Sequence, residues 1–261
     1  MTQTQLQIYT HEFHPKRGGI ATYCHEFARA AAEIGLKTHV FAPRNATAQT
    51  NQTVAYELLP SNWQGTHHPL NIWRARQSIG DACRSRDGAH LFAEPGSILA
   101  YGSLNANKRN SMNSYLTLHG SEIQRWSRPS LARLFAQRAM QSAHKIAVVS
   151  QPIAQFAREQ FPSYAHKMQA VPNALPHSLR SVPEVSRGGR SGSFKVLSVG
   201  RIHPRKGYDQ VLKAMAKLPP QIRSEIEYTI LGGAKDSHYL KSLQSFAYEK
   251  QLSLKVQLDA S

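Results

Sequence analysis

A short basic loop in the last third of the sequence carries residue types that suit a diphosphate. It reads Gly-Arg-Ile-His-Pro-Arg-Lys-Gly over residues 200–207, and its cations are Arg201, Arg205 and Lys206. Guanidinium and ammonium groups beside a helix N-terminus are well placed to bind phosphate oxygens. The alternative is a solvated basic loop that binds nothing.

The sequence on either side of this loop predicts how it is held. The apolar run at residues 194–199 predicts a buried parallel strand. The segment 207–217 has apolar residues at i, i+3, i+4 and i+7, which predicts a helix that begins at Gly207. The loop is therefore expected at the carboxyl end of a strand, where open α/β sheets bind their ligands.

A glycine pair separates the first predicted strand, residues 6–9, from the first predicted helix. Gly18 and Gly19 allow a ligand to approach the backbone closely, and the N–H groups of a helix start can bind phosphate oxygens. A plain tight turn is the alternative. The pair is neither the three-glycine dinucleotide fingerprint nor a P-loop, which argues against a nicotinamide-dependent oxidoreductase. The inward face predicted for the helix consists of Ile20, Tyr23, Cys24, Phe27, Ala31 and Ile34.

A histidine follows another predicted strand, residues 115–118. At the carboxyl end of a parallel strand, His119 would face the ligand cleft, where it could exchange a proton or bind a hydroxyl near neutral pH. Glu122 either supports this site or caps the start of the next helix. His11 and His14 have no evident third ligand, so we interpret them as a loop pair and expect no metal site.

The order of predicted elements indicates an α/β protein with doubly wound parallel sheets in two domains. We expect a first domain over residues 1–180, a Ser-, Gly-, Pro- and Arg-rich linker over 181–193, and a second domain over 194–261. The second domain stops directly after a strand-like run, where a parallel sheet needs a covering helix. We therefore expect this domain to be incomplete and the chain to be truncated.

Composition restricts the partners of the chain. Hydrophobic residues make up 41% of the 261 positions, and the formal net charge is +16, which favours anionic partners. The basic residues form no nucleic-acid recognition motif, so a phosphate-handling or membrane-proximal protein is favoured over a sequence-specific reader. With two cysteines, no apolar run of membrane-spanning length and no secretory signal, a cytoplasmic protein is expected, with membrane association on the cytoplasmic face left open.

Several short motifs taken together resemble the glycogen-synthase-like retaining glycosyltransferases of the GT-B fold, which are glycosyltransferase family 4 and the glycosyl transferases group 1. The motifs are Phe13-His14-Pro15-Lys16-Arg17-Gly18-Gly19-Ile20, Leu118-His119-Gly120-Ser121-Glu122, Ala147-Val148-Val149-Ser150, Val171-Pro172-Asn173-Ala174, Val199-Gly200-Arg201, Lys206-Gly207-Tyr208-Asp209 and Ile230-Leu231-Gly232-Gly233. Each motif is weak alone, and their order across nearly the whole chain makes the set specific. The resemblance implies two Rossmann-like domains, the first for the acceptor and the second for a nucleotide-diphosphate sugar.

The resemblance also implies roles for individual residues. Arg201 and Lys206 would neutralise the donor diphosphate, with Arg205 in support, and main-chain N–H groups at Gly18 and Gly19 would reach the same phosphates. His119 would bind a hydroxyl of the reacting sugar as the catalytic histidine. Asn173 would lie near the inter-domain junction, and Ala174 replaces the glycine that often follows it. The acceptor would be a glycan or glycolipid, and neither a cofactor nor a metal would be needed.

One family feature is missing from the sequence. The family usually has a Glu-x7-Glu motif for the donor well after the Arg/Lys loop, and here the glutamates that follow Lys206 are Glu225, Glu227 and Glu249. No two of these are eight positions apart. Three hypotheses therefore stay open: a glycosyltransferase of polysaccharide or cell-envelope synthesis, a catalytically inactive remnant or binding module, and a nucleic-acid binder driven by charge alone.

Overall fold

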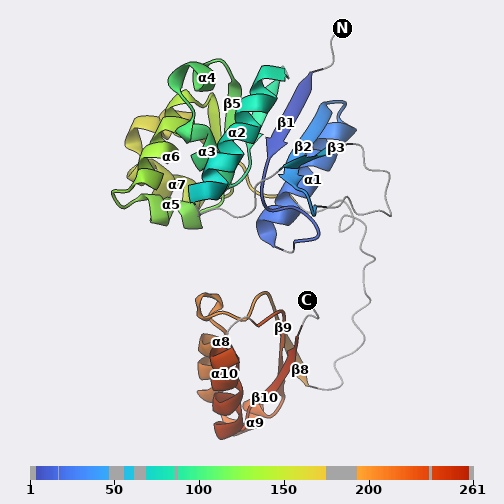
Figure 1. Ribbon diagram of the computed structural model, residues 1–261. Helices are drawn as coiled ribbons and strands as arrows, with labels where there is room; N and C mark the ends of the chain where they lie inside the picture. Colours follow the sequence, from blue (N-terminus) through green and yellow to red (C-terminus); the bar gives the residue numbers. More distant parts are fainter. Residues whose placement is uncertain are drawn as a thin grey trace. The chain divides into compact units, whose positions relative to one another are not determined.

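The computed structural model describes residues 4–16, 18–46, 56–61, 69–85, 88–174, 193–234 and 237–258. The chain divides into two compact units, Met1–Val182 and Pro183–Ser261, and each unit is described by itself (Figure 1). The linker expected at 181–193 lies outside the described residues except for Ser193. The boundaries of the linker therefore stay a prediction.

The first unit contains a seven-stranded sheet in which every pairing is parallel. The strand order is β3-β2-β1-β4-β5-β6-β7. The strands are β1 (Gln5–Tyr9), β2 (Lys37–Pro43), β3 (Glu57–Ser61), β4 (Ala89–Phe92), β5 (Asn113–Leu118), β6 (Lys145–Val148) and β7 (Met168–Ala170). The order reverses between β1 and β4, and such a reversal opens the ligand crevice of a doubly wound sheet.

Helices cover both faces of this sheet, which confirms the doubly wound α/β architecture. The helices are α1 (Gly19–Glu33), α2 (Pro69–Ser85), α3 (Pro95–Ser103), α4 (Ala106–Asn110), α5 (Ser121–Trp126), α6 (Leu131–Ser142) and α7 (Gln151–Gln160), with a 3-10 turn η1 (Pro162–Lys167). Helix α1 packs on the face that carries Ile8, Val40 and Leu91. Helices α2, α3 and α6 belong to the core cluster that contains Tyr9 and Phe92.

The inward face of α1 differs from the predicted stripe. Cys24 and Ala31 are buried as expected, but Phe27 is 38% exposed and Ile34 is 78% exposed. The buried positions are instead Ala21, Cys24, His25, Ala28 and Ala31. Small alanines let the helix axis approach the sheet closely, so the larger apolar residues lie at the margin of the contact.

Helix α3 is not evident from the sequence, because Pro95-Gly96 after a short apolar run is typical of a turn at the end of a strand. Glu94 caps this helix: its carboxylate accepts the N–H groups of Gly96 at 2.5 Å and Ser97 at 2.6 Å. Proline is favoured in the first turn of a helix, where its missing N–H costs nothing. Helix α3 is almost wholly buried, and it lies between the sheet and its neighbours α2 and α6.

The second unit contains a three-stranded parallel sheet in the order β10-β9-β8. The strands are β8 (Phe194–Val199), β9 (Ile226–Leu231) and β10 (Ser253–Gln257), and the helices are α8 (Tyr208–Ala216), α9 (Pro220–Arg223) and α10 (Ser237–Glu249), with a 3-10 turn η3 (Pro204–Lys206). The apolar or alternating runs at residues 194–199, 226–231 and 253–257 predict three strands, and β8, β9 and β10 have these bounds. Helix α8 begins at Tyr208, one residue later than predicted, because Gly207 is its N-cap.

The prediction that β8 is buried on both sides is wrong. Val196, which shares a register with Tyr228 and Leu254, packs against α8 and α10, and Figure 1 shows both helices on one face of the sheet. On the other side Leu197 is 62% exposed and Val199 is 68% exposed. No helix among the described residues has both the length and the apolar character needed to cross a lipid bilayer.

Candidate functional site

The turn after β5 holds His119 in a fixed backbone conformation. Gly120 has a φ of +120°, and a Cβ at this position would lie 2.9 Å from Cδ1 of Ile153, so only glycine fits here. Glu122 is 2% exposed, and its Oε1 accepts the N–H groups of both His119 and Gly120. Glu122 therefore holds the backbone of the turn that carries His119, and its part in a ligand site stays a prediction.

The ring of His119 has one nitrogen engaged and one available. Its Nε2 lies 2.9 Å from the carbonyl oxygen of Ala93, at the end of the neighbouring strand β4. A carbonyl can only accept, so Nε2 carries a proton, and Nδ1 is an acceptor in the tautomer that this contact selects. The ring of Tyr23 packs edge-on against the imidazole, with 5.1 Å between ring centroids. The half-buried histidine is thus oriented to accept a hydrogen bond, for example from a sugar hydroxyl.

Buried charged groups lie at the same edge of the sheet, after β1 and β4. Nδ1 of His11 is 2.7 Å from Oε2 of Glu94, which is fully buried. Nε2 of His11 is 3.5 Å from Oε1 of Glu12, and Nζ of Lys16 is 3.6 Å from the same oxygen. The sequence predicts only a loop position for His11, and the partner role of Glu94 is not evident from it. A glutamate directly before Pro-Gly-Ser is the signal that could have revealed this cap and its partner.

Cys24 lies in the core beneath these groups and is not a nucleophile. Burial raises the pKa of its thiol to about 12, so the thiolate is not populated near neutral pH. Burial likewise raises the pKa of Tyr23 to about 12. Among the described residues, no cluster of three or more His, Cys, Asp or Glu side chains is arranged to hold a metal ion.

The predicted glycine pair forms the exposed start of α1. Gly18 is the N-cap in an extended conformation, without a side-chain hydrogen bond to the helix, and the first turn carries no acidic residue. A Cβ on Gly19 would meet no atom within 4 Å. The space beside Gly19 is therefore open, and the positive end of the helix dipole at this N-terminus suits an anion. A hollow of about 170 Å³ beside them is lined in part by Phe13, Lys16 and Asn45.

The backbone of the basic loop in the second unit is held by hydrogen bonds, and its basic side chains are exposed to solvent. Oη of Tyr208 donates to the carbonyl oxygens of Gly200, at 2.9 Å, and Arg201, at 3.2 Å. Gly207 is left-handed, with a φ of +71°, and it is the N-cap of α8. Three basic side chains of the loop are exposed, those of Arg201, Arg205 and Lys206. Within the described part of the chain, none of them forms an ion pair.

The structure brings some of the predicted site residues together. His119 and Glu122 share one turn, and Gly18 and Gly19 follow β1 at the same carboxyl edge of the sheet. Asn173 follows β7, the edge strand, and is exposed. Arg201, Arg205 and Lys206 belong to the second unit. Their expected meeting with the glycine pair on one diphosphate stays a prediction.

Comparison with known proteins agrees with the arrangement of these motifs. Residues 17–179 match the profile of Glycosyltransferase Family 4. The chain belongs to glycosyltransferase family 4. Residues 185–258 match Glycosyl transferases group 1, so the two profiles divide this family 4 chain much as its two units do.

A curated relative of this family 4 chain is the GDP-mannose-dependent alpha-(1-6)-phosphatidylinositol monomannoside mannosyltransferase of Mycolicibacterium smegmatis. The two are 25% identical over 260 residues. The match covers 93% of this chain, and the chain spans 63% of the length of that relative.

Solved structures share the fold. HepE of Anabaena in complex with UDP and glucose superposes with a TM-score of 0.68 at 15% identity, covering 99% of this chain and 70% of that one. The catalytic domain of starch synthase IV from Arabidopsis thaliana, bound to ADP and acarbose, gives a TM-score of 0.66 at 12% identity, covering 100% of this chain and 75% of the other. These likenesses confirm the predicted GT-B fold.

Proposed function

We propose that this chain binds the donor of a retaining glycosyltransferase, a nucleotide-diphosphate sugar, and that the donated sugar passes to a glycan or glycolipid acceptor. The observation that carries the proposal is the loop at residues 200–207. It holds Arg201 and Lys206 exposed, without ion-pair partners among the described residues, on a backbone fixed by Tyr208. Two unpaired cations at the carboxyl end of a parallel strand match the charge of a diphosphate.

The roles of the other residues follow from the same chemistry. Arg201 and Lys206 stabilise the negative charge that develops on the leaving diphosphate, with Arg205 in support. The N–H groups that begin at Gly19 add positive potential to the phosphates. Nδ1 of His119 accepts a hydrogen bond from a hydroxyl of the donor sugar. This bond positions the sugar for transfer. The basic side chains provide this charge without a metal.

The candidate donors come from the relatives. One relative is named as GDP-mannose-dependent, and HepE was crystallised with UDP and glucose. We propose GDP-mannose and UDP-glucose as the first donors to test. The net charge of +16 supports an anionic or membrane-borne acceptor, reached by peripheral contact with the cytoplasmic face of a membrane.

A nucleotide titration tests the diphosphate site. Calorimetry with GDP and UDP should show saturable binding to the wild-type chain, weakened about tenfold or more by Arg201→Ala or Lys206→Ala, since each removes a charge-assisted hydrogen bond. Lys217→Ala, which removes an exposed lysine at the end of α8, is the matched control and should leave the affinity within about twofold. The proposal fails if no nucleotide saturates the protein, or if Lys217→Ala is as harmful as Arg201→Ala.

A second candidate function, binding without transfer, is favoured by the positions of the glutamates. Glu225 and Glu227 lie at the amino end of β9, the edge of the sheet opposite the basic loop, and Glu249 ends α10. None of the three can hold the donor's sugar and ribose beside that loop in the second unit. Transfer of radiolabelled mannose or glucose decides between the two: saturable nucleotide binding with no transfer would support the binding module.

A further inference from the structure

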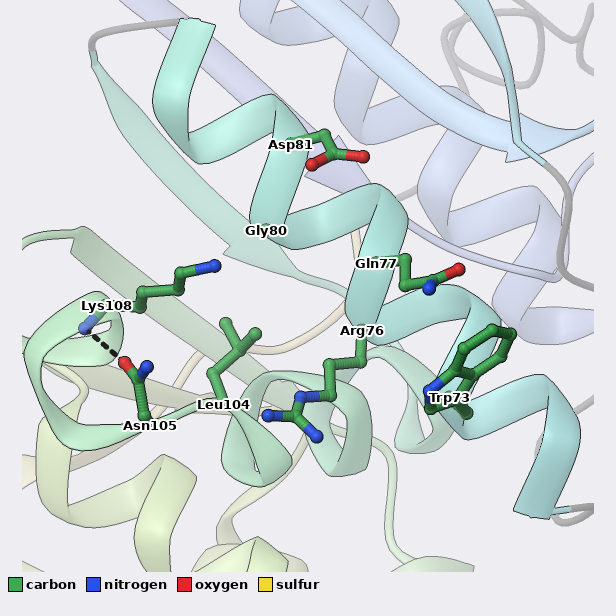
Figure 2. Close-up of a pocket in the computed structure, with 8 residues that line it drawn as sticks. All are labelled: Trp73, Arg76, Gln77, Gly80, Asp81, Leu104, Asn105 and Lys108. Atoms are coloured by element: carbon green, nitrogen blue, oxygen red, sulfur yellow. Dashed lines mark hydrogen bonds between the residues drawn. The ribbon is translucent and has the colours of Figure 1, made fainter.

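A second hollow of about 460 Å³ opens on the surface of the first unit (Figure 2). One wall is α2, with Trp73, Arg76 and Gln77. The other is the turn that joins α3 to α4, with Leu104 and Lys108. Pockets that bind small ligands have volumes of about 300–1,000 Å³, so this hollow can hold one.

The hollow lies away from the candidate site. Helix α2 leads back from the carboxyl end of β3 to the amino end of β4, and α3 with α4 leads to the amino end of β5. The α3–α4 turn is thus at the amino edge of the sheet. His119 follows the carboxyl end of β5. A ligand in the hollow would therefore not compete for the histidine turn.

Two cations from different elements enter this hollow. In Figure 2, Arg76 extends from α2 and Lys108 from α4, with Leu104 between them. Within the described ranges, neither cation has a carboxylate partner. Nζ of Lys108 lies 3.6 Å from where a Cβ of Gly80 would be, so the missing side chain leaves room for the ammonium group over α2. Asp81 also lines the hollow, and in Figure 2 its carboxylate points away from Lys108.

The remaining lining suits a ring that carries hydroxyl groups. The indole of Trp73 is 53% exposed, a large apolar surface at the end of the hollow beside Arg76. An aromatic face packs against the C–H groups of a sugar ring and buries apolar area. The amide of Gln77 also lines the hollow and offers a hydrogen-bond donor and an acceptor. Arginine provides a planar fork for phosphate oxygens.

We propose that this hollow binds a phosphorylated sugar, with the phosphate between Arg76 and Lys108 and the ring against Trp73. The sugar phosphate is either free or the headgroup of a lipid. This site goes beyond the proposed transferase function, because it requires neither the donor loop nor His119. It gives the first unit a binding surface for an anionic carbohydrate at the edge opposite the candidate active site.

Titration with glucose 6-phosphate tests the site, followed by calorimetry and tryptophan fluorescence. Saturable binding is expected, weakened about tenfold by Arg76→Ala or Lys108→Ala and about two- to tenfold by Trp73→Ala. Arg74→Ala is the matched control, because Arg74 is exposed on α2 but does not line the hollow. Arg201→Ala should leave this binding unchanged, which separates the test from that of the diphosphate loop.

Three results would overturn the proposal: no saturable binding of glucose 6-phosphate, an equal loss in Arg74→Ala, or equally tight binding of uridine monophosphate. Flotation with phosphatidylcholine vesicles, with and without phosphatidylinositol, identifies the source of the sugar phosphate. Recruitment by phosphatidylinositol that is lost in both Arg76→Ala and Lys108→Ala supports a lipid headgroup. Glucose 6-phosphate binding without such recruitment supports a free sugar phosphate. Recruitment that both variants retain would contradict the hollow as the lipid's site.

Discussion

Replacing Gly232 by alanine should damage the basic loop without touching any of its cations. Gly232 follows β9, and a Cβ there would lie 2.0 Å from the carbonyl oxygen of Gly200, the first residue of the loop. A carbon and an oxygen come no closer than about 3.3 Å without strain, so the loop and the β9 turn must separate by about 1.3 Å. Gly232 also has a φ of +156°, which side chains rarely adopt.

The magnitude follows from these two effects. Overpacking costs about 1–3 kcal/mol and an unfavourable φ costs about 1–3 kcal/mol, so we expect a loss of about 2–6 kcal/mol in the stability of the second unit. Gly233→Ala is the matched control, since a Cβ on Gly233 would meet no atom within 4 Å. Its effect should stay within about 0.5 kcal/mol.

Hydrogen exchange measured by mass spectrometry gives the stability of the second unit by itself. Peptides covering β8 and β9 should exchange about 30- to 25,000-fold faster in Gly232→Ala, and within about twofold of wild type in Gly233→Ala. UDP and GDP affinity should fall with the loop displacement in the first variant only. Equal protection in Gly232→Ala and wild type, or equal damage by both substitutions, would refute the close approach of Gly232 to the loop.

Three further results are expected. Gly102→Ala should lower the free energy of unfolding by at least about 2 kcal/mol in urea melts, because its Cβ would lie 1.8 Å from the backbone oxygen of Phe135. Gly80→Ala is the control: its Cβ would make only ordinary contacts, so it should be neutral or stabilising by up to about 1 kcal/mol. The reverse ranking would contradict the packing of α3 against α6. Glu122→Ala should cost about 1–3 kcal/mol by removing the acceptor of two N–H groups, whereas Glu122→Gln keeps an acceptor oxygen and should cost less; equal losses would rule out that role. Burial raises the pKa of the Cys24 thiol from 9.0 to about 12 in the folded protein, so the unfolded thiol ionises first and the free energy of unfolding should fall as pH rises from about 9 to 12. Cys24→Ala should make the free energy of unfolding less dependent on pH in this range. An unchanged pH dependence would exclude the thiol as its cause.

The sequence predicts most of the fold because strand–helix alternation is local. The strands that carry the site residues end where apolar runs end, so His119 and the basic loop could be placed at carboxyl ends without a structure. The second sheet was predicted to the residue, because each of its strands is a short apolar or alternating run between clear breakers.

What could not be predicted depends on contacts distant in the sequence. The apolar run of β8 reads the same whether one or both faces of its sheet are covered, so its exposure was missed. Pro95-Gly96 reads as a turn although Glu94 directly before it caps a helix, and the local pattern does not reveal that Glu94 also contacts His11, 83 positions earlier. The orientation of His119 likewise depends on Ala93, on the neighbouring strand. Local pattern carries no information on such partners.

The sheet of the second unit has a consequence for how the basic loop is controlled. Strand β8 is the last strand of the order β10-β9-β8, so its backbone N–H and C=O groups on one flank are unpaired within that sheet. The basic loop at residues 200–207 directly follows the carboxyl end of the same strand. An extended polypeptide that pairs with the open edge of β8 would restrict the motion of the end of this strand. It would also lie close to Arg201. If the loop binds a nucleotide as we propose, strand addition at β8 should alter that affinity, and nucleotide binding should alter strand addition in turn.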